Sequence, residues 1–115
     1  MPKNAPLAAE DCQTMADVRA AIDALDADLV RLLARRFAYM RAAARIKPER
    51  GQVRDEARKA AVIANAAALA GELGLPNDVI ADVWERLVEG SIAYELNAWD
   101  AGRDGLWCVD PIDGT

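Results

Sequence analysis

The 115-residue sequence is informative first in what it lacks. It contains no histidine, so the commonest metal ligand and the usual general base are both missing. Only 5% of its residues are aromatic, and valine and isoleucine occur singly rather than in the runs typical of strands. No segment approaches the ~20 uncharged apolar residues of a membrane-spanning helix. These absences favour an all-α protein without a metal centre or a membrane partner.

Positive charge and cysteine are also scarce. The formal net charge is −5, which argues against a nucleic-acid partner because phosphate binding needs surplus positive charge on some face. The two cysteines, Cys12 and Cys108, lie near opposite ends and form no CxxC motif, so we expect reduced, structural thiols. The segment from Met1 to Glu10 has no apolar stretch typical of a secretory signal. We therefore expect a cytoplasmic protein.

A long first helix is predicted from Met15 to Lys47. Thr14 and Asp17 form a capping pattern before it, and Pro48 ends it. At 1.5 Å per residue this helix would be roughly 50 Å long, whereas a small domain is about 30 Å across. Its apolar residues recur at alternating steps of four and three, as in a coiled-coil seam: Val18, Ile22, Leu25, Leu29, Leu32, Tyr39, Ala43 and Ile46. We therefore expect a homodimer in which a second copy covers the projecting end.

Two further helices are predicted. One runs from about Val53 to Leu73, with an inner face of Val62, Ala66, Leu69 and Leu73, and Gly74 ends it in a left-handed conformation. The last starts at Pro76 or Asn77 and ends near Gly102, and its inner face carries Ile80, Trp84, Leu87, Val88, Ser91, Tyr94, Glu95 and Trp99. We assign residues 1–13 to an N-terminal extension, 14–101 to one helical domain, and 102–115 to an extended or disordered tail.

Charged and polar residues occupy several positions where a core residue is expected. Arg36 lies on the seam of the first helix, and Lys47, eleven residues later, points to nearly the same side. Arg58 heads the apolar stripe of the second helix, while Ser91 and Glu95 interrupt that of the third. Burying an unpaired guanidinium is costly. One carboxylate against three cations leaves a deficit of negative charge, which a small organic dianion would supply.

Each of these residues also has a structural explanation. The cations can form internal salt bridges or extend to solvent, and the Ser91 hydroxyl can bond back to its own helix. Arg19 lies seventeen residues before Arg36, or about 26 Å along the same helix. It can reach the same pocket only from an antiparallel partner subunit, and it is otherwise a solvated charge beside Asp23.

Several segments, in order and spacing, resemble the all-helical chorismate mutase family, including its relative isochorismate pyruvate lyase. The resemblance covers about Asp11 to Trp99 and is carried by Val18 to Asp26, Leu32 to Arg36, Lys47, Gln52 to Arg58, and Ser91 to Glu95. It implies an intertwined homodimer with two equivalent sites and no cofactor. By the same resemblance, Arg36 and the partner subunit's Arg19 hold two carboxylates, Lys47 and Glu95 contact the ether oxygen, Arg58 helps to close the site, and Ser91 and Asp55 line it.

The family's reaction suits a chain without histidine. A Claisen rearrangement needs no nucleophile, base or metal, only a fixed reactive conformer and positive charge at the ether oxygen. Two positions depart from the family pattern. Glu95 stands where many members have Gln, and it must be protonated to donate a hydrogen bond, so we expect activity to rise toward acid pH. Lys59 stands where many mutases carry a Glu that binds the substrate hydroxyl.

We favour a chorismate mutase of aromatic amino-acid biosynthesis, which converts chorismate to prephenate. The first alternative is isochorismate pyruvate lyase, which forms salicylate and pyruvate. The opening Glu10-Asp11-Cys12 resembles that branch, and the missing helix-two Glu also fits it. An alternative of another class is a non-catalytic helical dimerisation or regulatory module. It explains the long helix equally well, but it does not explain charged residues at inner positions.

Overall fold

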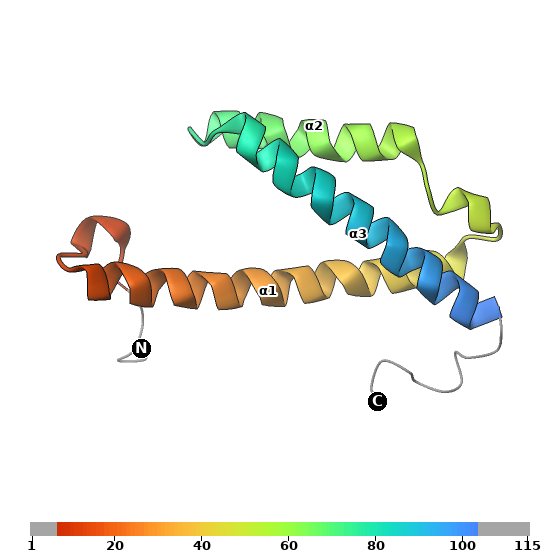
Figure 1. The fold of residues 1–115 in the computed structure, drawn as a ribbon, viewed down its shortest axis with the longest axis horizontal. Coiled ribbons are helices and arrows are strands. Elements are labelled where there is room, and N and C mark those ends of the chain that lie inside the picture. Colours follow the sequence, from red (N-terminus) through yellow and green to blue (C-terminus); the bar gives the residue numbers. More distant parts are fainter. Residues whose placement is uncertain (1–6, 104–115) are drawn as a thin grey trace. The chain divides into compact units, whose positions relative to one another are not determined.

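The computed structural model describes residues 7–103, and these residues form only helices, turns and loops (Figure 1). In chain order the elements are η1 (Ala9–Asp11), α1 (Met15–Ile46), η2 (Arg50–Gln52), α2 (Glu56–Glu72) and α3 (Asn77–Arg103). The predicted all-α fold with a long first helix is confirmed. The predicted tail beyond residue 103, with Cys108, lies outside the described residues. Within residues 7–103 no helix has the length and apolar character needed to cross a bilayer.

The chain divides into two compact units, Met1–Arg36 and Phe37–Thr115, and the boundary falls within α1. In the first unit the start of α1 is capped as predicted. Asp17 donates its N–H to Thr14 Oγ1 at 3.1 Å, and its carboxylate accepts from the N–H groups of Gln13 and Thr14. The bond from Gln13, followed by those of Thr14, lowers the pKa of Asp17. This reciprocal pattern satisfies N–H groups that have no partner within the helix.

The apolar seam of α1 is largely exposed in the single chain. Ile22, Leu25, Leu29 and Leu32 are between 48% and 60% exposed, although each has the chemistry of a core residue. Soluble proteins seldom leave a continuous apolar stripe uncovered unless it binds another surface. Within residues 7–103, the first unit therefore presents an exposed apolar face.

In the second unit, α2 and α3 form an antiparallel pair (Figure 1). Gly74 ends α2 with φ of 75°, the left-handed conformation predicted for it. The pair buries Val53, Val88 and Ile92, with five flanking side chains packed against them: Val62, Ile63, Trp84, Leu96 and Trp99. The predicted inner face of α3 is confirmed, since all eight of its residues are buried or half-buried.

The second helix differs from the prediction in its start and in its face. It begins at Glu56 rather than Val53, because Asp55 caps it by accepting the Arg58 N–H at 2.9 Å. On its face, Leu69 is exposed while Ala70 is 3% exposed. Leu73 is exposed as well. The side of α2 that packs on α3 is thus rotated by about one residue from the predicted stripe.

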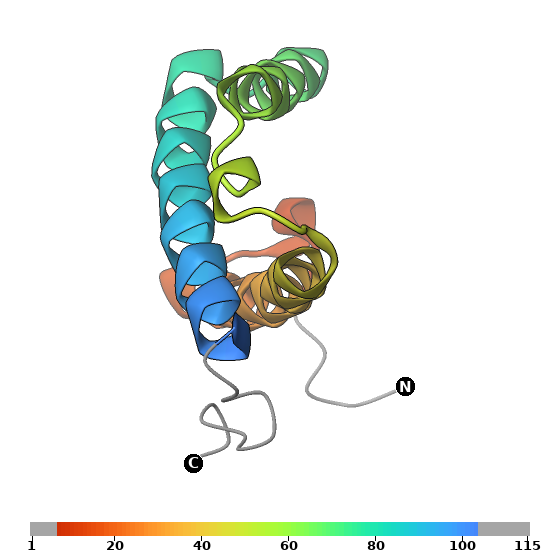
Figure 2. The same cartoon turned by 90° about the vertical axis from the view of Figure 1, so that its right-hand side faces the viewer.

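The last ten residues of α1 are tied to α3 within the second unit. The rings of Phe37 and Tyr94 meet edge to face, with centroids 4.9 Å apart. Arg41 Nη1 donates to the Tyr94 hydroxyl at 2.7 Å. Figure 2 shows the ends of α1 and α3 side by side, with η2 next to them. This packing brings the residue after α1, Lys47, close to the middle of α3.

Candidate active site

Lys47 and Glu95 meet between the end of α1 and α3. Lys47 Nζ lies 2.8 Å from Glu95 Oε2, and the two side chains are 30% and 5% exposed. The contact is an ion pair by distance but lacks hydrogen-bond geometry, so Glu95 Oε2 is the one buried side-chain oxygen or nitrogen among the described residues without a hydrogen bond. Buried polar atoms are nearly always bonded. The buried carboxyl oxygen of Glu95 therefore has the Lys47 ammonium as its charged neighbour, and it makes no well-directed hydrogen bond.

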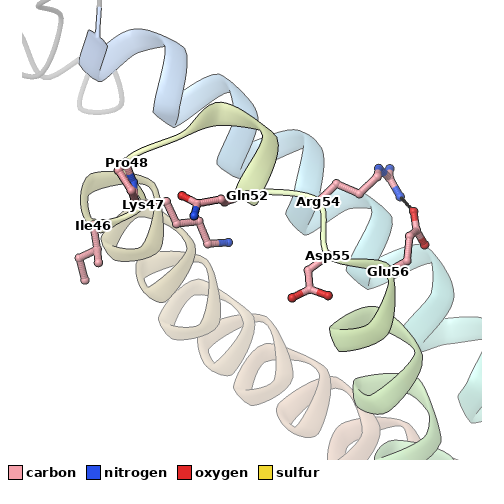
Figure 3. Close-up of a pocket in the computed structure, with 7 residues that line it drawn as sticks. All are labelled: Ile46, Lys47, Pro48, Gln52, Arg54, Asp55 and Glu56. Atoms are coloured by element: carbon pink, nitrogen blue, oxygen red, sulfur yellow. Dashed lines mark hydrogen bonds and ion pairs between the residues drawn. The ribbon is translucent and has the colours of Figure 1, made fainter.

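An open cavity of about 600 Å³ begins beside this lysine. It is lined by Ile46, Lys47, Pro48, Gln52, Arg54, Asp55 and Glu56, which come from the end of α1, the loop after it and the start of α2. In Figure 3 the side chains of Lys47 and Asp55 project toward a common space, whereas that of Arg54 turns to Glu56. The cavity thus combines an ammonium and a carboxylate with an open entrance.

Three other predicted site residues lie on the second unit. Asp55 lines the cavity and caps α2. Ser91 is 3% exposed, and its hydroxyl donates to the Leu87 carbonyl at 2.7 Å, the bond to its own helix anticipated from the sequence. Arg58 is exposed in the single chain, although its sequence position indicated an inner one. The reason is the later start of α2, which leaves Arg58 in the first turn of the helix.

The two remaining predicted residues, Arg19 and Arg36, lie on the part of α1 that belongs to the first unit. Arg19 is exposed and Arg36 is half-buried. The described site in the second unit therefore contains Lys47, Glu95 and Asp55, with Ser91 one helical turn before Glu95 on α3.

A network of ion pairs joins α2 to α3 beyond the cavity. Arg54 makes two hydrogen bonds to Glu89, at 3.0 and 2.8 Å. Lys59 Nζ lies 2.8 Å from Glu85 and 2.7 Å from Glu89. The bonds from Arg54 and then Lys59 lower the pKa of Glu89 to about 2. The Lys59 ammonium, which the family pattern would replace by a carboxylate, is thus held by two carboxylates of α3.

Sequence reasoning missed two residues that contact the backbone of Lys47. Trp99 Nε1 donates to the Lys47 carbonyl at 3.2 Å, and Arg103 also donates to that carbonyl. The sequence predicts a helix that ends near Gly102, and α3 ends one residue later, at Arg103. The available signal was spacing, because Glu95, Trp99 and Arg103 follow one another at steps of four along one helix face.

Comparison with known proteins identifies the class. The sequence pattern of type II chorismate mutases matches residues 18–96, well over half of the chain. The chain is also 34% identical to the isochorismate pyruvate lyase of Pseudomonas aeruginosa over 94 residues, which cover 82% of this chain and 93% of that protein.

The chain belongs to the type II chorismate mutase family, and it is an enzyme of that family. The family resemblance stated from the residues is confirmed. The non-catalytic helical module considered as an alternative is not supported.

Proposed function

We propose that the protein is a chorismate mutase, which rearranges chorismate to prephenate. The observation that carries the proposal is the 2.8 Å contact between Lys47 Nζ and the buried Glu95 Oε2, next to an open cavity. In the rearrangement the ether C–O bond breaks while a C–C bond forms, and no atom is gained or lost. The enzyme must hold a chair-like conformer and stabilise the negative charge that develops on the ether oxygen.

Lys47 and Glu95 would act on that ether oxygen. The ammonium of Lys47 donates one hydrogen bond and supplies positive charge where the charge develops. Glu95 would donate a second bond in its protonated form. The buried position of the Glu95 side chain shields its contact from water and so strengthens it.

The carboxylates of the substrate would be held by guanidinium groups. Arg36 binds one carboxylate and the partner subunit's Arg19 binds the other, because guanidinium and carboxylate pair through two parallel hydrogen bonds. Arg58 has an exposed side chain at the head of α2 and closes over the bound dianion. Asp55 and Ser91 line the site. No cofactor is required, since the reaction is a rearrangement within one molecule.

The same proposal requires an intertwined homodimer. Its support is the exposed apolar seam of α1, where Ile22, Leu25, Leu29 and Leu32 lie uncovered in the single chain. A second antiparallel α1 would cover this seam and bring its Arg19 to the Arg36 end. The two negative charges of the substrate would then balance the cationic side chains that the two subunits contribute to the site.

Mixing two inactive variants tests the shared site. In the proposed dimer each site takes Lys47 from one subunit and Arg19 from the other. A dimer of one Arg19→Ala subunit and one Lys47→Met subunit therefore has one site with both residues intact and one site with both residues replaced. After unfolding and refolding together, activity should return to about a quarter of the unmutated value, because half of randomly assorted dimers are mixed. A mixture of Lys47→Met with Glu95→Ala, both from the same subunit, is the matched control and should stay inactive. Failure of the first mixture to regain activity would refute the shared site.

A second candidate, isochorismate pyruvate lyase, is favoured by the relative from Pseudomonas aeruginosa. The decisive experiment supplies purified protein with chorismate and with isochorismate, and identifies the products by mass spectrometry. Formation of prephenate with the higher kcat/KM supports the mutase. A higher kcat/KM for isochorismate, with salicylate and pyruvate as products, assigns the lyase instead. Turnover of neither compound rejects both activities.

A further inference from the structure

One face of α3 contacts both the side-chain ammonium and the backbone carbonyl of Lys47. Glu95, Trp99 and Arg103 lie at steps of four, which places them in a row along the helix. Glu95 pairs with the side-chain ammonium of Lys47. Trp99 and Arg103 donate to its backbone carbonyl. A single row of three side chains therefore holds both the charged group and the backbone of Lys47.

The contacts of Trp99 and Arg103 also reinforce each other. Arg103 donates from Nη1 to the Ala44 carbonyl at 3.0 Å and from Nη2 to that of Lys47. Its guanidinium carbon lies 4.2 Å from the centroid of the Trp99 ring, a cation–π distance. Carbonyls in the last turn of a helix have no partner within the helix, and a cation there is favoured by the helix dipole.

This arrangement matters because Lys47 stands where α1 stops. Its N–H still bonds to the Ala43 carbonyl at 2.9 Å, but Pro48 follows and cannot donate a hydrogen bond. A lysine ammonium sits on a flexible four-carbon chain, so the direction of its backbone decides where the charge can reach. Donors fixed on α3 hold that backbone in one direction.

We propose that Trp99 and Arg103 are positioning residues that hold the Lys47 backbone so that its ammonium faces Glu95 and the reacting ether oxygen. This role rests on the proposed function for its effect on catalysis, and on the geometry alone for its effect on Lys47. Neither residue is among those that line the cavity. Their loss changes the placement of a catalytic charge rather than the charge itself.

Kinetics of three variants give the first test. Trp99→Phe keeps an aromatic ring but removes the N–H, and Arg103→Gln removes the guanidinium. Each should lower kcat by about threefold to tenfold, as expected for losing one or two hydrogen bonds, while KM changes by less than about twofold. Arg103→Lys should recover part of the loss. Arg50→Gln is the matched control, because it breaks the bond between the α1–α2 loop and Asp100 of α3 without touching Lys47, and it should leave kcat unchanged.

A double-mutant cycle separates positioning from general stability. In a Lys47→Met background, Trp99→Phe and Arg103→Gln should cause no further loss of kcat, since the group that they position is absent. A further loss equal to that in the unmutated protein would overturn the proposal. An equal loss of kcat in Arg50→Gln would overturn it as well.

The second readout does not depend on catalysis. Trace acylation followed by mass spectrometry measures the reactivity of the Lys47 amine, with Lys59 as the reference within the same molecule. Both Trp99→Phe and Arg103→Gln should raise the labelling of Lys47 relative to Lys59, and circular dichroism should show an intact fold. Unchanged labelling of Lys47 in both variants refutes the positioning. If the unmutated chain turns over neither substrate, the proposed function fails, and the labelling still decides whether α3 holds Lys47.

Discussion

Two lysines of this chain face carboxylates of α3, and their surroundings differ. Lys59 lies between Glu85 and Glu89, and Glu89 is bonded to Arg54 as well, so that each charged group has a partner. Lys47 pairs with Glu95, whose carboxyl oxygen Oε2 is buried and lies 2.8 Å from the ammonium without hydrogen-bond geometry. The first arrangement is a partly exposed network of several charges, whereas the second is a single pair with a buried carboxyl group.

The difference separates charges that support the fold from charges that bind. Partly exposed ion pairs are weakened by water and salt, and they contribute little to stability one by one. A buried pair with an unsatisfied atom is costly for the fold, and such groups concentrate at functional sites. The Lys59 network therefore fastens α2 to α3, and the Lys47–Glu95 pair is the candidate for catalysis. Four predictions test this contrast.

The largest expected difference is between the kcat/KM values of the Lys47→Met and Lys59→Met variants. Lys47→Met should lower kcat/KM by about 10²- to 10³-fold, the usual loss when a donor to a developing oxyanion is removed. Lys59→Met should lower it by less than about fivefold, since its ammonium is taken up by two carboxylates. Steady-state loss of chorismate measures both. Equal losses for the two variants would break the contrast.

Arg36→Ala should lower kcat/KM by about 10²-fold, because one carboxylate of the dianion loses its partner. Its thermal stability separates the two roles of Arg36, because loss of a structural contact lowers the melting temperature whereas loss of a ligand-binding group need not. The neighbouring Arg35→Ala, at an exposed position of the same helix, is the control and should keep its activity. Kinetics and thermal melting decide the question. A large drop in melting temperature for Arg36→Ala would indicate a structural ion pair instead.

The pH profile should show the protonation of Glu95. Only the protonated carboxyl can donate to the ether oxygen, so kcat of the unmutated enzyme should rise toward acid pH. Glu95→Gln donates at every pH, so the activity of this variant should extend to higher pH than that of the unmutated enzyme. The measurement is kcat from pH 5 to 8 for both proteins. A flat profile for the unmutated enzyme contradicts this role.

Glu89→Gln should affect stability rather than catalysis. Arg54 and Lys59 lower the pKa of Glu89 to about 2 from its usual 4.5. Because the folded-state pKa is depressed, the carboxylate stabilises the fold above pH 4.5, and this contribution is lost as the pH falls toward about 2. The unmutated protein should therefore lose stability over that window more steeply than Glu89→Gln. Thermal melting at several pH values measures this slope, and identical slopes would show that the network contributes nothing.

Local patterns predicted most of the fold. Thr14 and Asp17 marked the start of α1, Gly74 the end of α2, and the inner face of α3 was read correctly from its apolar spacing. The face of α2 was misread by about one residue. Because α2 is rich in alanine, several of its faces are similarly apolar. Packing against α3 buries Ala70 and leaves Leu69 exposed.

The sequence predicted which types of residue form the candidate site, but it predicted only some of the contacts between them. Polar interruptions of an apolar stripe are visible in a sequence, and they singled out Lys47 and Glu95 as groups that need partners. The bonds from Trp99 and Arg103 to the Lys47 carbonyl join positions more than fifty residues apart in sequence. No local pattern specifies such a contact, because it depends on how two helix ends pack.

The sequence by itself determined the helices, their order and the residues that break their apolar faces, because helix periodicity and capping act over a few neighbouring residues. Only the tertiary structure decided which lysine joins a partly exposed network of carboxylates and which pairs with the buried carboxyl group of Glu95. The physical reason is that burial and ion pairing depend on distances between side chains, and packing of distant segments sets those distances.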